Sequence, residues 1–233
     1  MRLFNGVRTG ILGRSGAVIL AAALFLGLAG SAHSQTPSDP NPAEERFDRI
    51  LILPVYDMRA VYGENFSMQG PLSGEVFAID VVDPQAAEFV RKTLRSALEQ
   101  KGTFRLIPAT AEDAIAMVGL APVAGSRRER ITAIQRIAGQ RGADAVVCTF
   151  VYAFRNRVGN AYGVENPAMV SFELNLVSTA TGRIVWRRHF TETQKTLNEN
   201  LLNVGKFLQR KGRWVTAEEM AGQAIEDLLK SFP

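Results

Sequence analysis

Runs rich in apolar residues predict three β-strands. The run at 49–55 contains four consecutive aliphatic residues and is typical of a strand covered on both faces of a sheet. Two further strands are predicted at 104–107 and 143–154. We therefore expect three strands at widely separated places in the chain, the first of them in the centre of the sheet.

The segment 168–178 has a different pattern, because apolar and polar residues alternate along it. Its apolar side consists of Val170, Phe172, Leu174 and Leu176, and its polar side of Ser171, Glu173 and Asn175. Strict alternation is typical of a strand with one face in the core and the other in water. The turn at 179–182 then predicts a hairpin that returns as a fifth strand over 183–191.

Helical periodicity and capping signals predict five helices. We expect Asp83 to cap the first, with Pro84 at its first position and Gly102 past its end. Two more begin at the capping boxes Ser126-x-x-Glu129 and Thr216-x-x-Glu219, and the remaining two cover 110–118 and 197–208.

The order of these elements, β-α-β-α-α-β-β-β-α-α, predicts one α/β domain over 47–233 with a mixed five-stranded sheet and packed helices. Helical crossovers join the first three strands, which are therefore expected to be parallel. Tight connections join the last three, which are expected to be antiparallel. We expect one buried cluster made of Ile50, Ile52, Leu106, Val146, Phe172, Leu174 and Trp186.

Residues 1–34 have the composition of a secretory signal peptide. Three arginines precede an apolar run at 17–29, which is shorter than the ~20 residues that a spanning helix needs. Cleavage is expected before Gln35, and the proline-containing segment 35–46 is expected to be a flexible linker. We therefore expect a periplasmic protein without a transmembrane span in its mature chain, and a peripheral association with the outer membrane stays open.

The leader also resembles a lipoprotein box, with serine at Ser31 where lipidation requires cysteine. The single cysteine of the chain, Cys148, lies in the apolar run of the third predicted strand. It is expected to be a buried hydrophobe rather than a nucleophile. We therefore expect neither an acyl anchor nor an internal disulfide.

Composition and motifs do not indicate catalysis. Removing the three leader arginines from the 27 basic residues leaves 24 against 23 acidic ones, so the charge does not indicate nucleic-acid binding. One histidine, His189, and one cysteine in the mature chain are too few for a zinc site, and nucleotide-binding glycine motifs are absent. We predict no enzyme, no cofactor and no metal. A hydrolase that uses loop carboxylates is an alternative, and its candidates are Asp57, Glu64, Glu75, Asp80 and Asp83.

Two basic clusters occur on predicted helices. One consists of Arg127, Arg128 and Arg130, and the other of Lys206, Arg210, Lys211 and Arg213. Such clusters are typical of a solvated helix face. In an exported protein, anionic envelope polymers or lipid head groups are favoured over nucleic acid as their partners.

Four segments in order resemble the motifs of a group of bacterial envelope domains. They are Ile50–Val55 (ILILPV, like VAVLPF), Gly102–Ile107 (like G-x-F-x-V-V), Gly142–Val147 (GADAVV) and Leu174–Trp186 (like L-x-L-V-D-x-x-T-G-x-V-L-W). The group includes the amino-terminal domain of the Tol-system propeller protein, the periplasmic part of the curli secretion lipoprotein, and the lipoprotein activators of penicillin-binding proteins. The resemblance covers roughly residues 48–190 and implies a non-enzymatic role in outer-membrane or cell-wall assembly. This chain departs from the group by its missing box cysteine and by a long insert after the first strand.

The resemblance to the curli lipoprotein implies an alternative function, as a subunit of an outer-membrane secretion complex. A pore subunit needs two membrane-crossing strands of ~9–11 residues in each hairpin. The connection at 155–167 is too short for two, and the insert at 57–83 is interrupted by glycines and a proline. We therefore favour an interaction or assembly module that binds another envelope protein or a peptidoglycan-related partner.

The topology suggests where such a partner would bind. If the first and third strands are parallel, the insert at 57–83 and the connection at 155–167 leave the same edge of the sheet, where sites of open α/β sheets usually lie. The two segments combine aromatic and charged residues, as protein-binding surfaces do. The candidate partner-binding residues are Arg59, Tyr62, Glu64, Phe66, Phe77, Arg155, Arg157, Tyr162 and Glu165. The alternative interpretation is that the aromatic residues only hold the insert against the domain.

Overall fold

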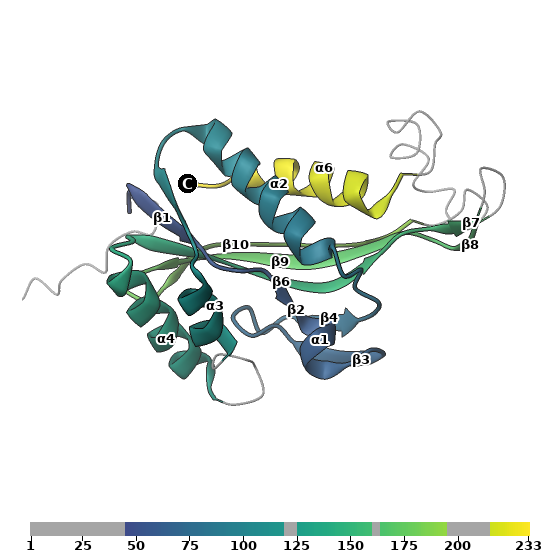
Figure 1. Cartoon of the computed structure of the whole chain (residues 1–233), viewed down its shortest axis with the longest axis horizontal. Helices are drawn as coiled ribbons and strands as arrows, with labels where there is room; N and C mark the ends of the chain where they lie inside the picture. The colour runs from purple at the N-terminus through teal and green to yellow at the C-terminus, as the bar shows by residue number, and fades with distance from the viewer. Residues whose placement is uncertain (1–44, 119–124, 160–163, 195–214) are drawn as a thin grey trace, which may run out of the picture. The chain divides into compact units, whose positions relative to one another are not determined.

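The computed structural model describes residues 45–118, 125–159, 164–194 and 215–233 (Figure 1). The central sheet consists of β1 (Arg49–Ile52), β2 (Tyr56–Asp57), β5 (Arg105–Pro108), β6 (Ala145–Arg155), β9 (Met169–Ser178) and β10 (Ile184–Thr193). Two hairpins stand apart from it, β3–β4 (Phe66–Gln69 and Val76–Ile79) and β7–β8 (Val158–Gly159 and Val164–Asn166). The helices are α1 (Met58–Tyr62), α2 (Ala86–Lys101), α3 (Ala111–Val118), α4 (Arg127–Gln140) and α6 (Ala217–Leu229).

The predicted mixed α/β sheet is confirmed, with one strand more than expected. The strand order is β10-β9-β6-β1-β5, and the short β2 pairs with the distal half of β6. The pairs β1–β5 and β1–β6 are parallel, whereas β6–β9 and β9–β10 are antiparallel, as the connections predicted. The leader, the linker up to residue 44 and the predicted helix at 197–208 lie outside the described residues.

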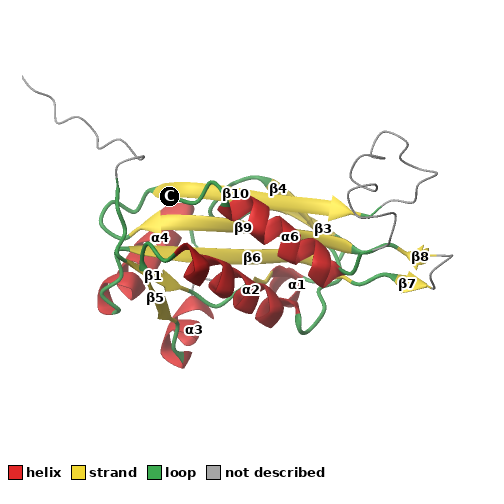
Figure 2. Cartoon of the chain, turned by 90° about the horizontal axis from the view of Figure 1, so that it is seen from above, coloured by secondary structure: helices red, strands yellow, loops and turns green. Residues whose placement is uncertain are grey.

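Helices and the insert cover the two faces of the sheet. In Figure 1, α2 and α6 lie above the sheet, and α3, α4, α1 and the β3–β4 hairpin lie below it. Seen from above in Figure 2, α2 and α6 run along the strands, and β7–β8 extends beyond the end of β6 and β9. No described helix is long and apolar enough to cross a membrane.

The sheet separates two hydrophobic clusters, so the prediction of a single cluster was wrong. Ile50 and Phe172 belong to the cluster under α2 and α6, whereas Val146 belongs to the cluster on the other face. Leu106 is only partly buried and packs against the first cluster. The physical reason is the alternation of side chains along a strand, which sends neighbouring residues to opposite faces. A strand covered on both faces therefore contributes to two clusters.

The expectation of a wet face on β9 was also wrong. Ser171, Glu173 and Asn175 are each at most 1% exposed. They lie on the face that the insert covers, and Glu173 contacts Tyr152 of β6. Alternation reports which residues share a face, but it does not report whether another segment covers the polar one.

Most helix ends follow the sequence signals. Both capping boxes are formed, at Ser126 with Glu129 and at Thr216 with Glu219. The helix α2 differs, because it begins at Ala86 instead of Pro84. The Asp83 side chain accepts a hydrogen bond from the Gln85 backbone N–H (2.8 Å), so it closes a turn before the helix and does not cap it.

Candidate functional site

The insert at 57–83 stays alongside β6 for its whole course. It leaves β1 through β2, where Tyr56 is in register with Phe150. It returns beside the same strand, since the Asp80 backbone N–H donates to the Tyr152 carbonyl oxygen (3.0 Å) and that of Asp83 donates to the Phe154 carbonyl oxygen (2.8 Å). The insert is therefore a folded addition to the sheet.

The insert begins with the short helix α1, which brings the candidate residues Arg59 and Glu64 together. The Asp57 carboxylate caps α1 by accepting a hydrogen bond from the Ala60 backbone N–H (3.1 Å). Gly63, at φ 84°, ends it in a conformation that favours glycine. Arg59 Nε, in the helix, donates to Oε1 of Glu64, which follows the helix, at 2.7 Å. These two candidates are thus brought together as an ion pair beside a shallow hollow of about 440 Å³.

The β3–β4 hairpin separates the two candidate phenylalanines. Phe77 is 5% exposed, and its ring stacks on Tyr152 with centroids 4.0 Å apart. Phe77 therefore holds the insert against the sheet and leaves little surface exposed. Phe66, on the other strand of the hairpin, is 51% exposed, and its ring stacks on that of Tyr62 with centroids 6.2 Å apart. Phe77 thus fits the interpretation that the aromatic residues hold the insert, whereas Phe66 stays a candidate for partner binding.

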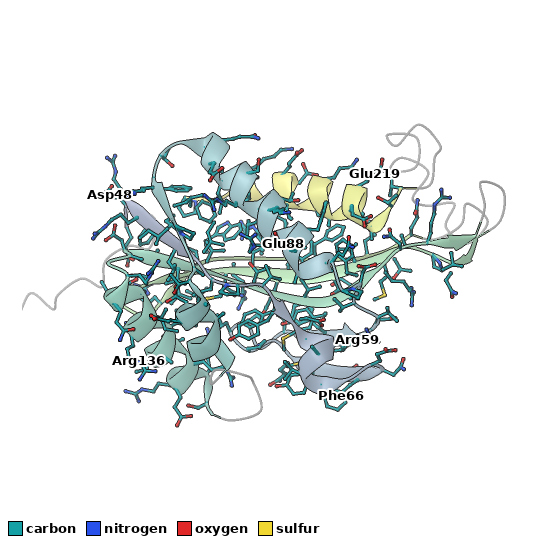
Figure 3. The ribbon with its side chains drawn as sticks, viewed as in Figure 1. Asp48, Arg59, Phe66, Glu88, Arg136 and Glu219 are labelled. Atoms are coloured by element: carbon teal, nitrogen blue, oxygen red, sulfur yellow. The ribbon has the colours of Figure 1, made fainter. Side chains whose placement is uncertain are left out.

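The large apolar side chains that are most exposed in the described part of the chain all lie on the two segments singled out by topology. Phe66 and Val76 belong to the insert, and Val158 belongs to the connection after β6, with exposed fractions of 51%, 71% and 51%. We call Tyr62 and Phe66, with the Arg59–Glu64 ion pair, the insert surface. Val76 lies opposite Gln69, on the other face of the hairpin, and is not part of this surface. Figure 3 labels Arg59 and Phe66 below the sheet.

An ion pair joins the end of the insert to the start of the β6–β9 connection. Arg155 Nη1 donates to Asp80 Oδ1 (2.8 Å), and Arg155 Nε donates to the Pro167 carbonyl oxygen (3.4 Å). Arg155 is therefore a structural bridge between the insert and the β6–β9 connection. Arg157 is half-buried, Tyr162 lies outside the described residues, and the side chain of Glu165 on β8 is not described.

A buried carboxylate that the sequence did not single out lies under the insert. Glu173 is 0% exposed, and its Oε1 accepts a hydrogen bond from the Tyr152 hydroxyl (2.9 Å). Burial raises the pKa of Glu173 above its ordinary value. The turn of the β3–β4 hairpin packs closely against Glu173, because a Cβ added at Gly70 would lie 3.0 Å from both of its carboxylate oxygens. The sequence signal that could have indicated this site is the charged Glu173 at the centre of the strand predicted over 168–178.

Side chains of β10 also hold the turn of the β3–β4 hairpin. Glu75 Oε2 lies 2.7 Å from His189 Nδ1, and its Oε1 lies 3.5 Å from Arg187 Nη2. Arg187 Nη1 also donates to the Ser73 carbonyl oxygen (3.1 Å). The insert is thus held at the turn of its hairpin, by β10, as well as at its end, by Arg155.

The structure gives each of the five loop carboxylates a structural contact. Asp57 caps α1, Glu64 pairs with Arg59, Glu75 pairs with β10, Asp80 pairs with Arg155 and Asp83 closes the turn before α2. Within the described ranges, no group of three or more His, Cys, Asp or Glu side chains is placed to hold a metal ion. Cys148 is fully buried, and burial raises the pKa of its thiol, which disfavours the nucleophilic thiolate.

A cleft of about 400 Å³ lies at the C-terminal ends of β1 and β5, beside α2. Its wall is mostly apolar, and its charged rim is already paired, through Arg91 with Glu88 and Arg95 with Glu99. The cleft lies one strand away from the exits of β1 and β6, where the candidate partner-binding residues leave the sheet.

Comparisons with known proteins found similarity to solved structures, and that similarity is distant. No protein-family model matches the chain, and no curated protein matches it. Solved structures that resemble it include envelope lipoprotein domains, which match the resemblance indicated by the four motifs. Among them is the PelC dodecamer from Paraburkholderia phytofirmans, with a TM-score of 0.45 and 14% identity over 78% of this chain and 84% of that chain.

Two further neighbours are more distant. Lipoprotein GNA1162 from Neisseria meningitidis has a TM-score of 0.37 and 15% identity, covering 70% of this chain and 96% of that one. The C-terminal domain of LpoB from Escherichia coli has a TM-score of 0.34 and 21% identity, covering 63% of this chain and 83% of that one.

Proposed function

We propose that this chain is a non-enzymatic interaction module of the bacterial cell envelope, which binds another envelope protein through the insert surface. In this proposal the leader is removed and the mature chain works in the periplasm. The observation that carries the proposal is the stack of the half-exposed Phe66 on Tyr62 at the surface of the insert. Exposed apolar side chains that lie together mark protein-binding sites in many soluble proteins.

The composition of the insert surface suits a protein partner. Tyr62 and Phe66 form a nearly parallel stack, with 7° between the ring planes, so they offer one broad apolar face. The Arg59–Glu64 ion pair lies at its side and can exchange hydrogen bonds with a partner. An aromatic centre with a charged rim is the usual anatomy of a protein–protein interface.

The insert surface is also rigidly supported. The Phe77–Tyr152 stack, the Glu75–His189 contact and the Arg155–Asp80 ion pair hold the insert at three separate places. A surface that is ordered before binding loses less conformational entropy when a partner arrives. This support favours binding of a folded partner over a role for the insert as a mere spacer.

Photo-crosslinking in intact cells tests the proposal. A photoreactive amino acid is placed at Tyr62, at Phe66, and at Lys92 as a matched control, since the Lys92 side chain is 70% exposed on the opposite layer. We expect a discrete crosslinked species from positions 62 and 66 but not from 92. Equal crosslinking from all three positions, or crosslinking only from position 92, would contradict the proposal.

A further inference from the structure

The outer face of α4 carries positive charge that its surroundings do not neutralise. Arg127, Arg128 and Arg136 are exposed, and within the described part of the chain they have neither an ion pair nor a hydrogen bond through their side chains. Figure 3 labels Arg136 at the outer side of the lower layer. The helix contains one acidic residue, Glu129.

That single carboxylate is already engaged. Glu129 accepts a hydrogen bond from the Ser126 backbone N–H as part of the capping box, and this contact lowers its pKa below the ordinary value. The neighbouring Arg130 donates to two carbonyl oxygens, of Pro71 (3.1 Å) and Gly125 (2.7 Å), and to no carboxylate. The helix therefore carries four guanidinium groups and one carboxylate.

The helix α2 on the opposite layer shows the contrast. Its Arg91 lies 2.6 Å from Glu88, and its Arg95 lies 2.7 Å from Glu99. In α4, two arginines instead occupy the first turn, where the positive end of the helix dipole disfavours them. Their placement lowers the stability of the helix, so an anionic partner would relieve a repulsion that the fold itself leaves in place.

The shape of the face fits phosphate groups on a surface. Arg128, Thr132 and Arg136 are spaced by four residues and form one row about 12 Å long. Arg128 and Thr132 line two adjoining shallow hollows, one of about 560 Å³ that reaches the β9–β10 turn and one of about 340 Å³ that reaches Arg136. Guanidinium groups bind phosphate oxygens through two parallel hydrogen bonds.

We propose that the outer face of α4 docks the protein on a membrane surface rich in anionic phospholipid, through contacts between these arginines and head-group phosphates. The most exposed large hydrophobic residues of the described chain lie elsewhere, so the contact is electrostatic and does not insert the helix. The proposal stands independently of the insert surface.

Co-sedimentation of the full mature chain with vesicles tests it. The vesicles are phosphatidylcholine alone, or phosphatidylcholine with one third phosphatidylglycerol. We compare the wild type with the triple variant Arg127→Gln, Arg128→Gln, Arg136→Gln. The matched control is Arg91→Gln, Lys92→Gln, Arg95→Gln on α2, which removes the same charge. Each basic residue near an anionic surface contributes roughly a factor of five to binding, so the α4 variant should bind roughly a hundredfold more weakly.

The expected pattern has three parts: binding of wild type to the anionic vesicles only, its loss in the α4 variant and with added salt, and its retention in the α2 control. The melting temperature of the α4 variant should equal or exceed that of the wild type, since two charges leave the positive helix end. Equal weakening in both variants would show a net-charge effect only and overturn the proposal. So would the absence of vesicle binding by a wild type that still binds soluble inorganic polyphosphate, because the partner would then be a polymer.

Discussion

Phe66 and Phe77 lie on the two strands of one hairpin and allow a matched test. Substitution by alanine should lower the stability of the domain at Phe77 and partner binding at Phe66. Phe77 is 5% exposed and stacked on Tyr152, so Phe77→Ala removes a buried aromatic ring from the second cluster. Such truncations cost ~3–5 kcal/mol of unfolding free energy. Phe66 is 51% exposed, so Phe66→Ala should cost less than ~1 kcal/mol.

Thermal unfolding and partner capture together separate the two effects. At ~2–4 °C per kcal/mol for a domain of this size, Phe77→Ala should lower the melting temperature by about 10 °C. Phe66→Ala should leave it nearly unchanged and reduce capture of the crosslinked partner at least tenfold, which corresponds to ~1.4 kcal/mol of binding free energy.

The reasoning would be refuted by the reverse result. If Phe66→Ala lowered the melting temperature as far as Phe77→Ala does and left capture per folded molecule unchanged, both rings would be structural. The partner would then have to bind elsewhere.

Three other predictions follow from the buried contacts and the leader. Glu173→Gln keeps an acceptor for the Tyr152 hydroxyl but removes the titration. Burial raises the folded-state pKa of Glu173, so the wild type should lose stability relative to this variant as the pH rises above the ordinary value of 4.5. Denaturant unfolding from about pH 4 to about pH 8 measures this difference in stability. An unchanged difference across that range would show that the carboxyl is solvated. Gly70→Ala should destabilise the domain by ~1–3 kcal/mol, since its Cβ would lie 2.2 Å from Ser73 Oγ, and Ser73→Ala should restore part of the loss in the same melts. Mass spectrometry of the exported protein should find Gln35 at its start, free or cyclised, and a diacylglycerol mass would contradict this.

The sheet could be predicted because the apolar patterns of its strands are strong, both in the long β6, β9 and β10 and in β1, which has only four residues. The parallel and antiparallel pairs followed from the lengths of the connections, and the capping boxes of α4 and α6 from two residues each. The insert could not be predicted in the same way. Its elements β2, α1, β3 and β4 have two to five residues each, so packing against β6 decides their structure more than local preference does.

The candidate site was predicted in outline and not in its details. Topology placed the insert and the β6–β9 connection together, and the Arg155–Asp80 ion pair lies where they meet. The sequence could not tell that Phe77 faces the sheet while Phe66 is half exposed, because that depends on how the hairpin lies against β6. The same missing information made the polar face of β9 look wet, although the insert covers it.

Hydrogen exchange of the mature chain, alone and bound to the protein that crosslinks to the insert, tests the central claim most directly. We predict that binding protects backbone amides of α1 and β3, between residues 58 and 69, and leaves those of α2 unchanged. Protection confined to α2, α6 or β5, with no change over 58–69, would contradict the assignment of the insert surface as the place where the partner binds.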